Sequence, residues 1–246
     1  MVLVDAHIHL PAYVDRGAPL RLSRAVPMCL ISCAVNHLEA GENVAIRSQM
    51  PRNIRCFVGV HPSDATEEPP STRLSPYLKD CDGIGEIGLD EKYSPTNDGS
   101  PQMSSFLDQL GVAEKLRKPV QVHSRGSEKR CLDVLGTFNL RAVMMQWFEG
   151  EAHVAEVVSR GYFVSVGPAL LYSKKIGRVA RAVPSENLLA ESDGPVPYAA
   201  LGGVSGPSLI PSVLLALAEA KHECYETIEE KLEENAKRFL GVERLI

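Results

Sequence analysis

The sequence predicts an α/β fold, a single (β/α)8 TIM barrel that forms one domain over residues 1–246. Short apolar runs alternate with longer stretches of helical pattern, and the runs are continuously apolar, as strands buried on both faces require. Eight such units in one chain favour a closed barrel over an open doubly wound sheet. The expected strands are Leu3–Ile8, Met28–Val35, Cys56–Val60, Gly83–Leu89, Val120–His123, Ala142–Phe148, Tyr162–Val166 and Leu188–Glu191.

The stretches between these runs are long enough for the crossover helices that join parallel strands. The clearest helical patterns are Pro101–Arg117, Glu128–Phe138, Ala152–Arg160 and Lys174–Val183. A last helix is expected at Thr227–Leu240, where Thr227 and Glu230 form a capping box and Gly241 ends the helix. We expect this helix to complete the outer layer of the barrel.

The composition is typical of a globular chain without a linker or a low-complexity segment. Hydrophobic residues make up 44% of the sequence, enough to bury a large core. The net charge of −5 provides no long-range attraction for nucleic acid, so any phosphate binding has to be local. The six cysteines form no CxxC pair, which favours buried free thiols. No signal peptide or membrane-spanning run is found, so we expect a cytoplasmic protein that does not enter the membrane.

Two histidines two residues apart end the first apolar run. His7 and His9 point to the same face of a strand and can hold a divalent transition metal together. A single strand histidine is more often a core residue, but polar groups that are costly to bury recur at the ends of other runs. They are His61, Glu86, Asp90, His123, Gln146, Glu191 and Asp193. Because strand ends surround one mouth of a barrel, the sequence predicts a metal site at the C-terminal ends of the strands.

Five motifs resemble, in order, successive signatures of the TatD family. They are Asp5–Leu10 (DAHIHL), Gly59–Pro62 (GVHP), Gly85–Asp90 (GEIGLD), Pro119–Arg125 (PVQVHSR) and Glu191–Pro195 (ESDGP). Each motif alone is weak, but five in order over most of the chain are specific. The resemblance implies a metal-dependent hydrolase of the amidohydrolase-like superfamily, associated with deoxyribonuclease activity.

The resemblance also implies a role for each matching residue. His7, His9 and Asp193 correspond to ligands of a first metal. Glu86 corresponds to a carboxylate that bridges two metals, and His123 to a ligand of the second. Asp193 and Glu86 are then the catalytic candidates, with Asp193 as the general base toward the attacking water. The implied cofactor is one or two divalent ions, and these ligands permit Zn, Mn, Mg, Co or Fe.

The sixth run departs from the family pattern. Gln146 stands in Met145–Gly150 (MQWFEG), where the family usually has a histidine. A neutral amide oxygen is a poor ligand for a transition metal, so the second site is expected to be weak. Glu149 and His153 are candidate substitutes, although Glu149 could equally cap a helix and His153 could face solvent.

The substrate-binding candidates are His61, Arg125 and Trp147. The resemblance implies that His61 lies near the substrate phosphate, and Trp147 could stack on a base or be a structural aromatic. The family commonly has an arginine and an asparagine after strand eight, whereas this chain has Ala199–Pro207 and no Lys or Arg from Gly194 to Ala220. Lys174, Arg178 and Arg181 share one face of the helix after strand seven, with Lys175 beside them. They could contact phosphate, but an ordinary solvated exterior face is the favoured interpretation, and only Lys174 and Lys175 are expected to reach the mouth.

Three functions remain open from the sequence. The first is a deoxyribonuclease with 3′-exonuclease-like activity, which would contact DNA ends or single-stranded DNA locally and transiently. The second is a hydrolase of a small amide, ester or phosphoester, favoured by the missing cations after strand eight. The third is a weakly active metal-binding protein, suggested by Gln146. The presence of His7, His9, Glu86 and Asp193 argues against the third function.

Overall fold

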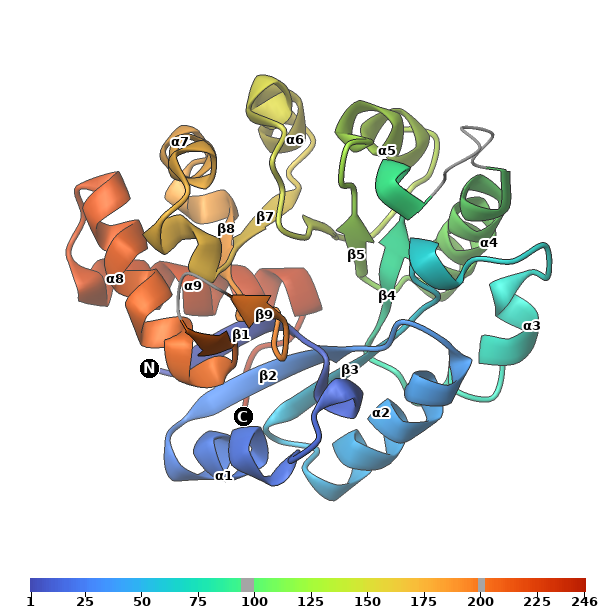
Figure 1. Cartoon of the computed structure of the whole chain (residues 1–246), viewed down its shortest axis with the longest axis horizontal. Coiled ribbons are helices and arrows are strands. Elements are labelled where there is room, and N and C mark those ends of the chain that lie inside the picture. The colour runs from blue at the N-terminus through green and yellow to red at the C-terminus, as the bar shows by residue number, and fades with distance from the viewer. Residues whose placement is uncertain (94–99, 199–201) are drawn as a thin grey trace.

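Eight parallel strands form one sheet in which each strand pairs with the next one along the chain. The computed structural model describes residues 1–93, 100–198 and 202–246, and the sheet curls into a nearly closed barrel (Figure 1). A bridge between Ile8 and Gly194 joins the first strand to the segment after the last one. The predicted TIM-barrel fold is confirmed. The strands are β1 (Leu3–Ile8), β2 (Met28–Cys33), β3 (Ile54–Val58), β4 (Gly83–Gly88), β5 (Val120–His123), β6 (Val143–Met145), β7 (Phe163–Val166) and β8 (Leu188–Ala190).

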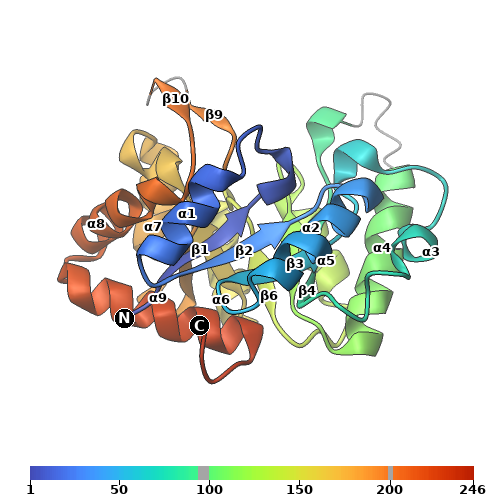
Figure 2. The ribbon, with the colours of Figure 1, turned by 90° about the horizontal axis from the view of Figure 1, so that it is seen from below.

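Each barrel strand is followed by a helix on the outside of the barrel (Figures 1 and 2). The helices are α1 (Gly17–Ala25), α2 (His37–Gln49), α3 (Pro70–Leu74), α4 (Ser100–Leu116), α5 (Glu128–Leu135), α6 (Val154–Ser159), α7 (Lys174–Ala182), α8 (Ile210–Lys221) and α9 (Tyr225–Leu240). A short antiparallel pair, β9 (Pro197–Tyr198) and β10 (Gly203–Val204), stands between β8 and α8. Among the described residues, no helix has the length and apolarity needed to cross a membrane.

The third strand begins and ends two residues earlier than the apolar run predicts. The earlier start reflects the pairing of Ile54 and Arg55 with Leu30 and Ile31 of β2. The earlier end is explained by Gln109 of α4, whose side chain bonds both backbone polar groups of Val60. Its Oε1 accepts from the Val60 N–H at 2.7 Å, and its Nε2 donates to the Val60 carbonyl at 3.1 Å. Val60 therefore leaves the sheet, and the chain that follows it is free to form the mouth of the barrel.

Helix α9 differs from its prediction in both its start and its position. It begins at Tyr225 and has Cys224 as its N-cap residue, without a side-chain capping bond, so the predicted capping box is wrong. Phe239 of α9 stacks on Phe57 of β3 at 5.8 Å and meets Phe163 of β7 at 5.9 Å between ring centroids. Because β3 and β7 lie on opposite sides of the barrel, α9 covers its N-terminal end and does not add to the outer layer (Figure 2). Because α9 covers the N-terminal end of the barrel with apolar side chains, the polar site residues lie at the C-terminal end.

All six cysteines are free, and five of them are buried, as expected for thiols that act as small apolar side chains. The exception is Cys224, which is exposed beside the start of α9.

Candidate metal centre

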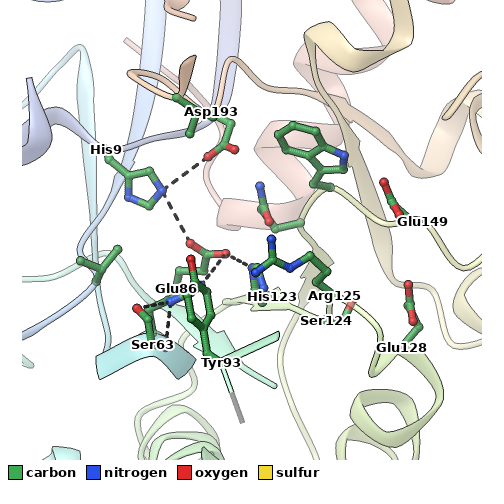
Figure 3. Close-up of a pocket in the computed structure, with 15 residues that line it drawn as sticks. His9, Ser63, Glu86, Tyr93, His123, Ser124, Arg125, Glu128, Glu149 and Asp193 are labelled. Carbon is green, nitrogen blue, oxygen red and sulfur yellow. Dashed lines mark hydrogen bonds and ion pairs between the residues drawn. The ribbon is translucent and has the colours of Figure 1, made fainter. Parts of the chain in front are cut away.

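Four side chains at or just beyond the ends of β1, β4 and β8 meet at the C-terminal end of the barrel. His7 and His9 come from β1 and the residue just beyond it, Glu86 from β4, and Asp193 from the segment after β8. The two imidazole Nε2 atoms are 3.0 Å apart, and each lies 3.5–3.6 Å from Oε2 of Glu86 and from Oδ1 of Asp193. Figure 3 shows His9, Glu86 and Asp193 turned toward one point. Ligand atoms about 2.0–2.2 Å from one ion lie about 3.0–3.6 Å from each other, so these spacings suit a shared ion.

Gln121 of β5 fixes the proton of His7 on Nδ1. The amide nitrogen of Gln121 donates to the Ala6 carbonyl at 2.7 Å, so its Oε1 points toward His7. Nδ1 of His7 lies 2.6 Å from this oxygen, which can only accept a hydrogen bond. Nδ1 therefore carries the proton, and Nε2 of the neutral imidazole presents a lone pair to the centre.

His9 is oriented in the same way by a backbone carbonyl. Its Nδ1 lies 3.2 Å from the carbonyl oxygen of Cys33, which also can only accept. When both rings are neutral, two Nε2 lone pairs and two carboxylates thus face one buried point. Against the effect of burial, Cys33 and Glu86 raise the pKa of His7 well above its ordinary value, so a cation at this point would replace a proton on Nε2. The four side chains fit a divalent cation, which would satisfy all of them at once.

Asp193 is held in place by contacts between β1 and the segment after β8. The buried carboxylate of Asp5 accepts from the N–H of Ser192 at 2.8 Å and from its hydroxyl at 2.6 Å. The N–H of Asp193 donates to the carbonyl of His7 at 2.9 Å. Asp193 itself has φ 50°, a left-handed conformation that aspartate tolerates better than most residues. The strand that carries both histidines therefore also positions the carboxylate opposite them.

A second cluster of potential ligands consists of His61, Glu86 and His123. Oε1 of Glu86 lies 2.9 Å from Nδ1 of His123 and 3.9 Å from Nε2 of His61. Glu86 thus offers one oxygen to each cluster, the arrangement expected of a bridging carboxylate. Gly88 makes this approach of β4 and β5 feasible, since it has φ 142° and a Cβ there would lie 2.0 Å from the His123 carbonyl oxygen.

His123 is held between two carboxylates. Its Nε2 lies 2.7 Å from Oδ2 of Asp90, in addition to the contact of Nδ1 with Glu86. Although burial opposes the charged form, hydrogen bonds to Asp90 and Glu86 raise the pKa of His123 to about 9. Arg125 contacts the same oxygen of Asp90 at 2.7 Å. To bind a metal, His123 has to release its proton and give up one carboxylate contact.

His61 is arranged as a hydrogen-bond donor. The backbone N–H of Ser63 donates to Nδ1 of His61 at 3.1 Å, so the proton of the neutral ring lies on Nε2. Burial lowers the pKa of His61 to about 4, which keeps the ring neutral near pH 7. Its N–H points into the cavity that Glu86 and His123 also line.

Gln146 lines the cavity at the position where the family usually has a histidine. Its Nε2 is 3.5 Å from Oε1 of Glu191, whose pKa burial raises to about 8. The first candidate substitute, Glu149, pairs with Lys175 at 2.8 Å. Neither Glu149 nor His153 belongs to a potential ligand cluster among the described residues.

The two clusters lie at the base of a cavity of about 580 Å³ (Figure 3). Arg125 is the only lysine or arginine among the described residues that line it. It is 44% exposed and lies 5.2 Å above the ring of Tyr93. Trp147 also lines the cavity and stacks on Tyr198 with ring centroids 5.5 Å apart. In the segment Ala199–Pro207, which lacks the arginine and asparagine common in the family, residues 199–201 lie outside the described part of the chain.

The sequence as a whole matches a known family. The family model described as TatD related DNase covers residues 4–241. The chain belongs to the TatD-related DNase family. This membership confirms the resemblance carried by the five motifs and makes the protein a metal-dependent hydrolase of the TatD family.

Similar proteins from distant organisms support this membership. A human relative named deoxyribonuclease TATDN3 is 30% identical over 218 residues, which are 78% of each chain. A Mycobacterium tuberculosis relative named uncharacterized metal-dependent hydrolase TatD is 25% identical over 259 residues, with 98% of each chain covered. The crystal structure of a TatD homologue from Escherichia coli has a TM-score of 0.85 and covers 98% of both chains at 22% identity, which shows the shared fold.

Several residues that arrange this TatD-family site were not among the sequence-predicted candidates. Gln121, Asp5 and Ser192 orient the histidines or Asp193, and Cys33 contributes its carbonyl to His9. Gln121 could have been singled out from the sequence, because it is a polar residue within an otherwise apolar strand. Its role depends on contact with a residue 114 positions away, which the local pattern does not contain.

Proposed function

We propose that this TatD-family protein is a deoxyribonuclease that hydrolyses phosphodiester bonds at DNA ends, in a 3′-exonuclease-like manner. The observation that carries the proposal is the convergence of two imidazole lone pairs and two carboxylates at the base of a cavity of about 580 Å³. Small-ligand sites have volumes of about 300–1,000 Å³, so this cavity suits a terminal nucleotide better than a continuous duplex. The name of the human relative supports the same substrate class.

His7, His9 and Asp193 would hold one divalent cation, and Glu86 would reach from this ion toward a second one. A bound ion supplies Lewis-acid chemistry, since it lowers the pKa of a coordinated water and offsets charge on the phosphate. The hydrogen bonds from His7 to Gln121 and from His9 to the Cys33 carbonyl place the proton of each neutral ring on Nδ1, so that Nε2 can bind the ion.

Asp193 accepts the proton of the attacking water in this proposal. Its carboxylate lines the cavity and also faces both imidazoles, so it can reach the ion and the substrate together. Glu86 is more deeply buried, with 4% of its side chain exposed against 11% for Asp193. We therefore assign Glu86 to holding ions and Asp193 to proton transfer.

Three further residues would position the substrate. His61 donates its Nε2 proton to a phosphate oxygen, which its neutral form permits near pH 7. Arg125 at the rim has guanidinium donors beyond its contact with Asp90. Trp147 has one ring face on Tyr198, and the other can receive a base.

The second ion is expected to bind weakly. His123 is held by Glu86 and Asp90, and Gln146 offers only a neutral oxygen beside them. We propose that the protein holds one tight ion and takes up a second only at high metal concentration.

A second candidate function is hydrolysis of a small amide, ester or phosphoester on the same barrel. The charge of the cavity favours it, because Glu128 and Glu149 line the cavity together with a single cation, Arg125. A weakly active metal-binding protein is the remaining alternative, and Gln146 is the residue that supports it.

The proposal is tested with chelated protein that is reconstituted with Mn, Mg, Co or Zn. Wild type should release nucleotides from end-labelled single strands, and excess chelator should block this release. Asp193→Asn should lower kcat/KM by about 100- to 10,000-fold. Asp133→Asn removes an exposed carboxylate from α5 and should leave kcat/KM unchanged. Protein that cleaves a small ester or amide but no DNA with any of these metals would overturn the proposal in favour of the second candidate.

A further inference from the structure

A second groove of about 580 Å³ lies between α7 and α8, outside the cavity that holds the candidate metal centre. One wall carries the cations of α7, and the other is formed by small residues and one acid of α8. The residues that define this groove, which we call the α7 groove, include Tyr172, Lys174, Arg178, Arg181, Ala216 and Glu219. Figure 1 shows α7 and α8 side by side, with α6 on the other side of α7.

A chain of aromatic contacts links the α7 groove to the catalytic cavity. Trp147 lines the cavity and stacks on Tyr198, with ring planes only 6° apart. Tyr198 also meets the ring of Tyr172 at 6.4 Å between centroids. Tyr172 lines the groove and is 51% exposed. Tyr198 itself is buried, so Trp147 in the cavity and Tyr172 in the groove are the two rings of this chain that a bound molecule can touch.

The charge of the groove is opposite to that of the cavity. Lys174, Arg178 and Arg181 line the groove beside a single acid, Glu219. Arg178 is paired with Glu151 at 2.7 Å, whereas no described carboxylate lies within ion-pair distance of Lys174 or Arg181. In a chain of net charge −5, these cations form a local site for repeated negative charges.

We propose that the α7 groove binds the sugar–phosphate backbone of a single-stranded DNA tail whose end occupies the catalytic cavity. Lys174 and Arg181 contact two phosphates, and exposed Tyr172 stacks on a base between the groove and the cavity. This inference rests on the proposed deoxyribonuclease function. It also predicts that affinity depends on the length of the DNA strand, because a dinucleotide fills only the cavity whereas a longer strand also reaches the groove.

The test measures hydrolysis of single strands of about two, four, eight and twelve nucleotides at several salt concentrations. For wild type, KM should fall as the strand lengthens and then reach a plateau. In the double variant Lys174→Gln/Arg181→Gln, this gain should be largely lost, while KM and kcat for the dinucleotide stay unchanged. Loss of two phosphate contacts should reduce the slope of log affinity against log salt by about 1.4. This difference equals about sevenfold in affinity between about 50 and 200 mM salt.

The control variant is Arg24→Gln/Arg52→Gln, which removes two exposed cations that precede β2 and β3 and do not line the α7 groove. It has the same net charge as the groove variant and should behave like wild type. Tyr172→Ala should raise KM for the longer strands alone. Equal salt slopes in both double variants, or a wild-type KM that does not depend on length, would overturn the groove proposal and leave the deoxyribonuclease proposal standing. Wild type that cleaves no DNA of any length would overturn both.

Discussion

Replacing Gln121 by leucine should weaken metal binding at His7 and His9 by about 10- to 100-fold, although Gln121 is not itself a potential ligand. The amide oxygen of Gln121 lies 2.6 Å from His7, and its nitrogen donates to the Ala6 carbonyl at 2.7 Å. Without this amide, the His7 proton can move to Nε2 and block the ligand position. The buried His7 ring and Ala6 carbonyl also lose this partner at about 1–3 kcal/mol each, so the free energy of unfolding should fall by about 2–6 kcal/mol. The Cys33 thiol, which donates to the same amide oxygen at 2.7 Å, loses a further, weak hydrogen bond.

Calorimetric titration of chelated protein with Zn or Mn measures the affinity, and urea unfolding measures the stability. The matched control is Gln109→Leu, because Gln109 is equally buried and bonds the backbone of Val60 with both ends of its amide. The control should lose comparable stability and keep the affinity of the tight site. Wild-type affinity in the Gln121 variant, or the same affinity loss in the control, would refute the argument that the hydrogen bond to His7 prepares the metal site.

Other predictions concern the second cluster. Gln146→His should raise the metal content from about one ion per chain toward two, as mass spectrometry can measure, and two tight ions already in wild type would contradict the weak site. Gly88→Ala should lower the free energy of unfolding in urea by about 3 kcal/mol or more, because the new Cβ meets the His123 carbonyl at a φ that only glycine adopts readily. A variant as stable as wild type would contradict this prediction. Burial lowers the pKa of His61 to about 4, so the metal-free protein should lose stability as the pH falls from about 6.5 toward 4, by about 2 kcal/mol at pH 5. His61→Gln should lack this loss, and an unchanged pH dependence in the variant would show that other groups cause it.

The fold was predictable because strands that are buried on both faces are continuously apolar, and such runs are easily recognised in a sequence. All eight apolar runs correspond to barrel strands in order, and the limits of β1 and β5 agree with the prediction. The end of β3 was not predictable, since it depends on Gln109, a helix residue that is distant in sequence. The position of α9 depends on Phe239 meeting two opposite strands, and the apolar pattern of a helix does not distinguish the side of a barrel from its end.

The candidate site was predictable to the extent that its residues lie at strand ends. His7 and His9 are two residues apart on one strand, and the barrel topology brings Glu86 and Asp193 to the same mouth. The proton positions were not predictable, because they are set by Gln121 from across the barrel and by the carbonyl of Cys33 on the neighbouring strand β2. The α7 groove was not predictable from the sequence either, because the spacing of its cations is equally typical of a solvated helix face.

The most direct test of the central claim is anomalous diffraction from crystals of wild-type protein grown with Zn or Mn. We predict one strong peak about 2.0–2.2 Å from Nε2 of His7, from Nε2 of His9 and from a carboxylate oxygen of Asp193. A weaker peak between Glu86 and His123 should grow only at high metal concentration. Strong peaks at other places, with no density between the two histidines and Asp193, would contradict the account.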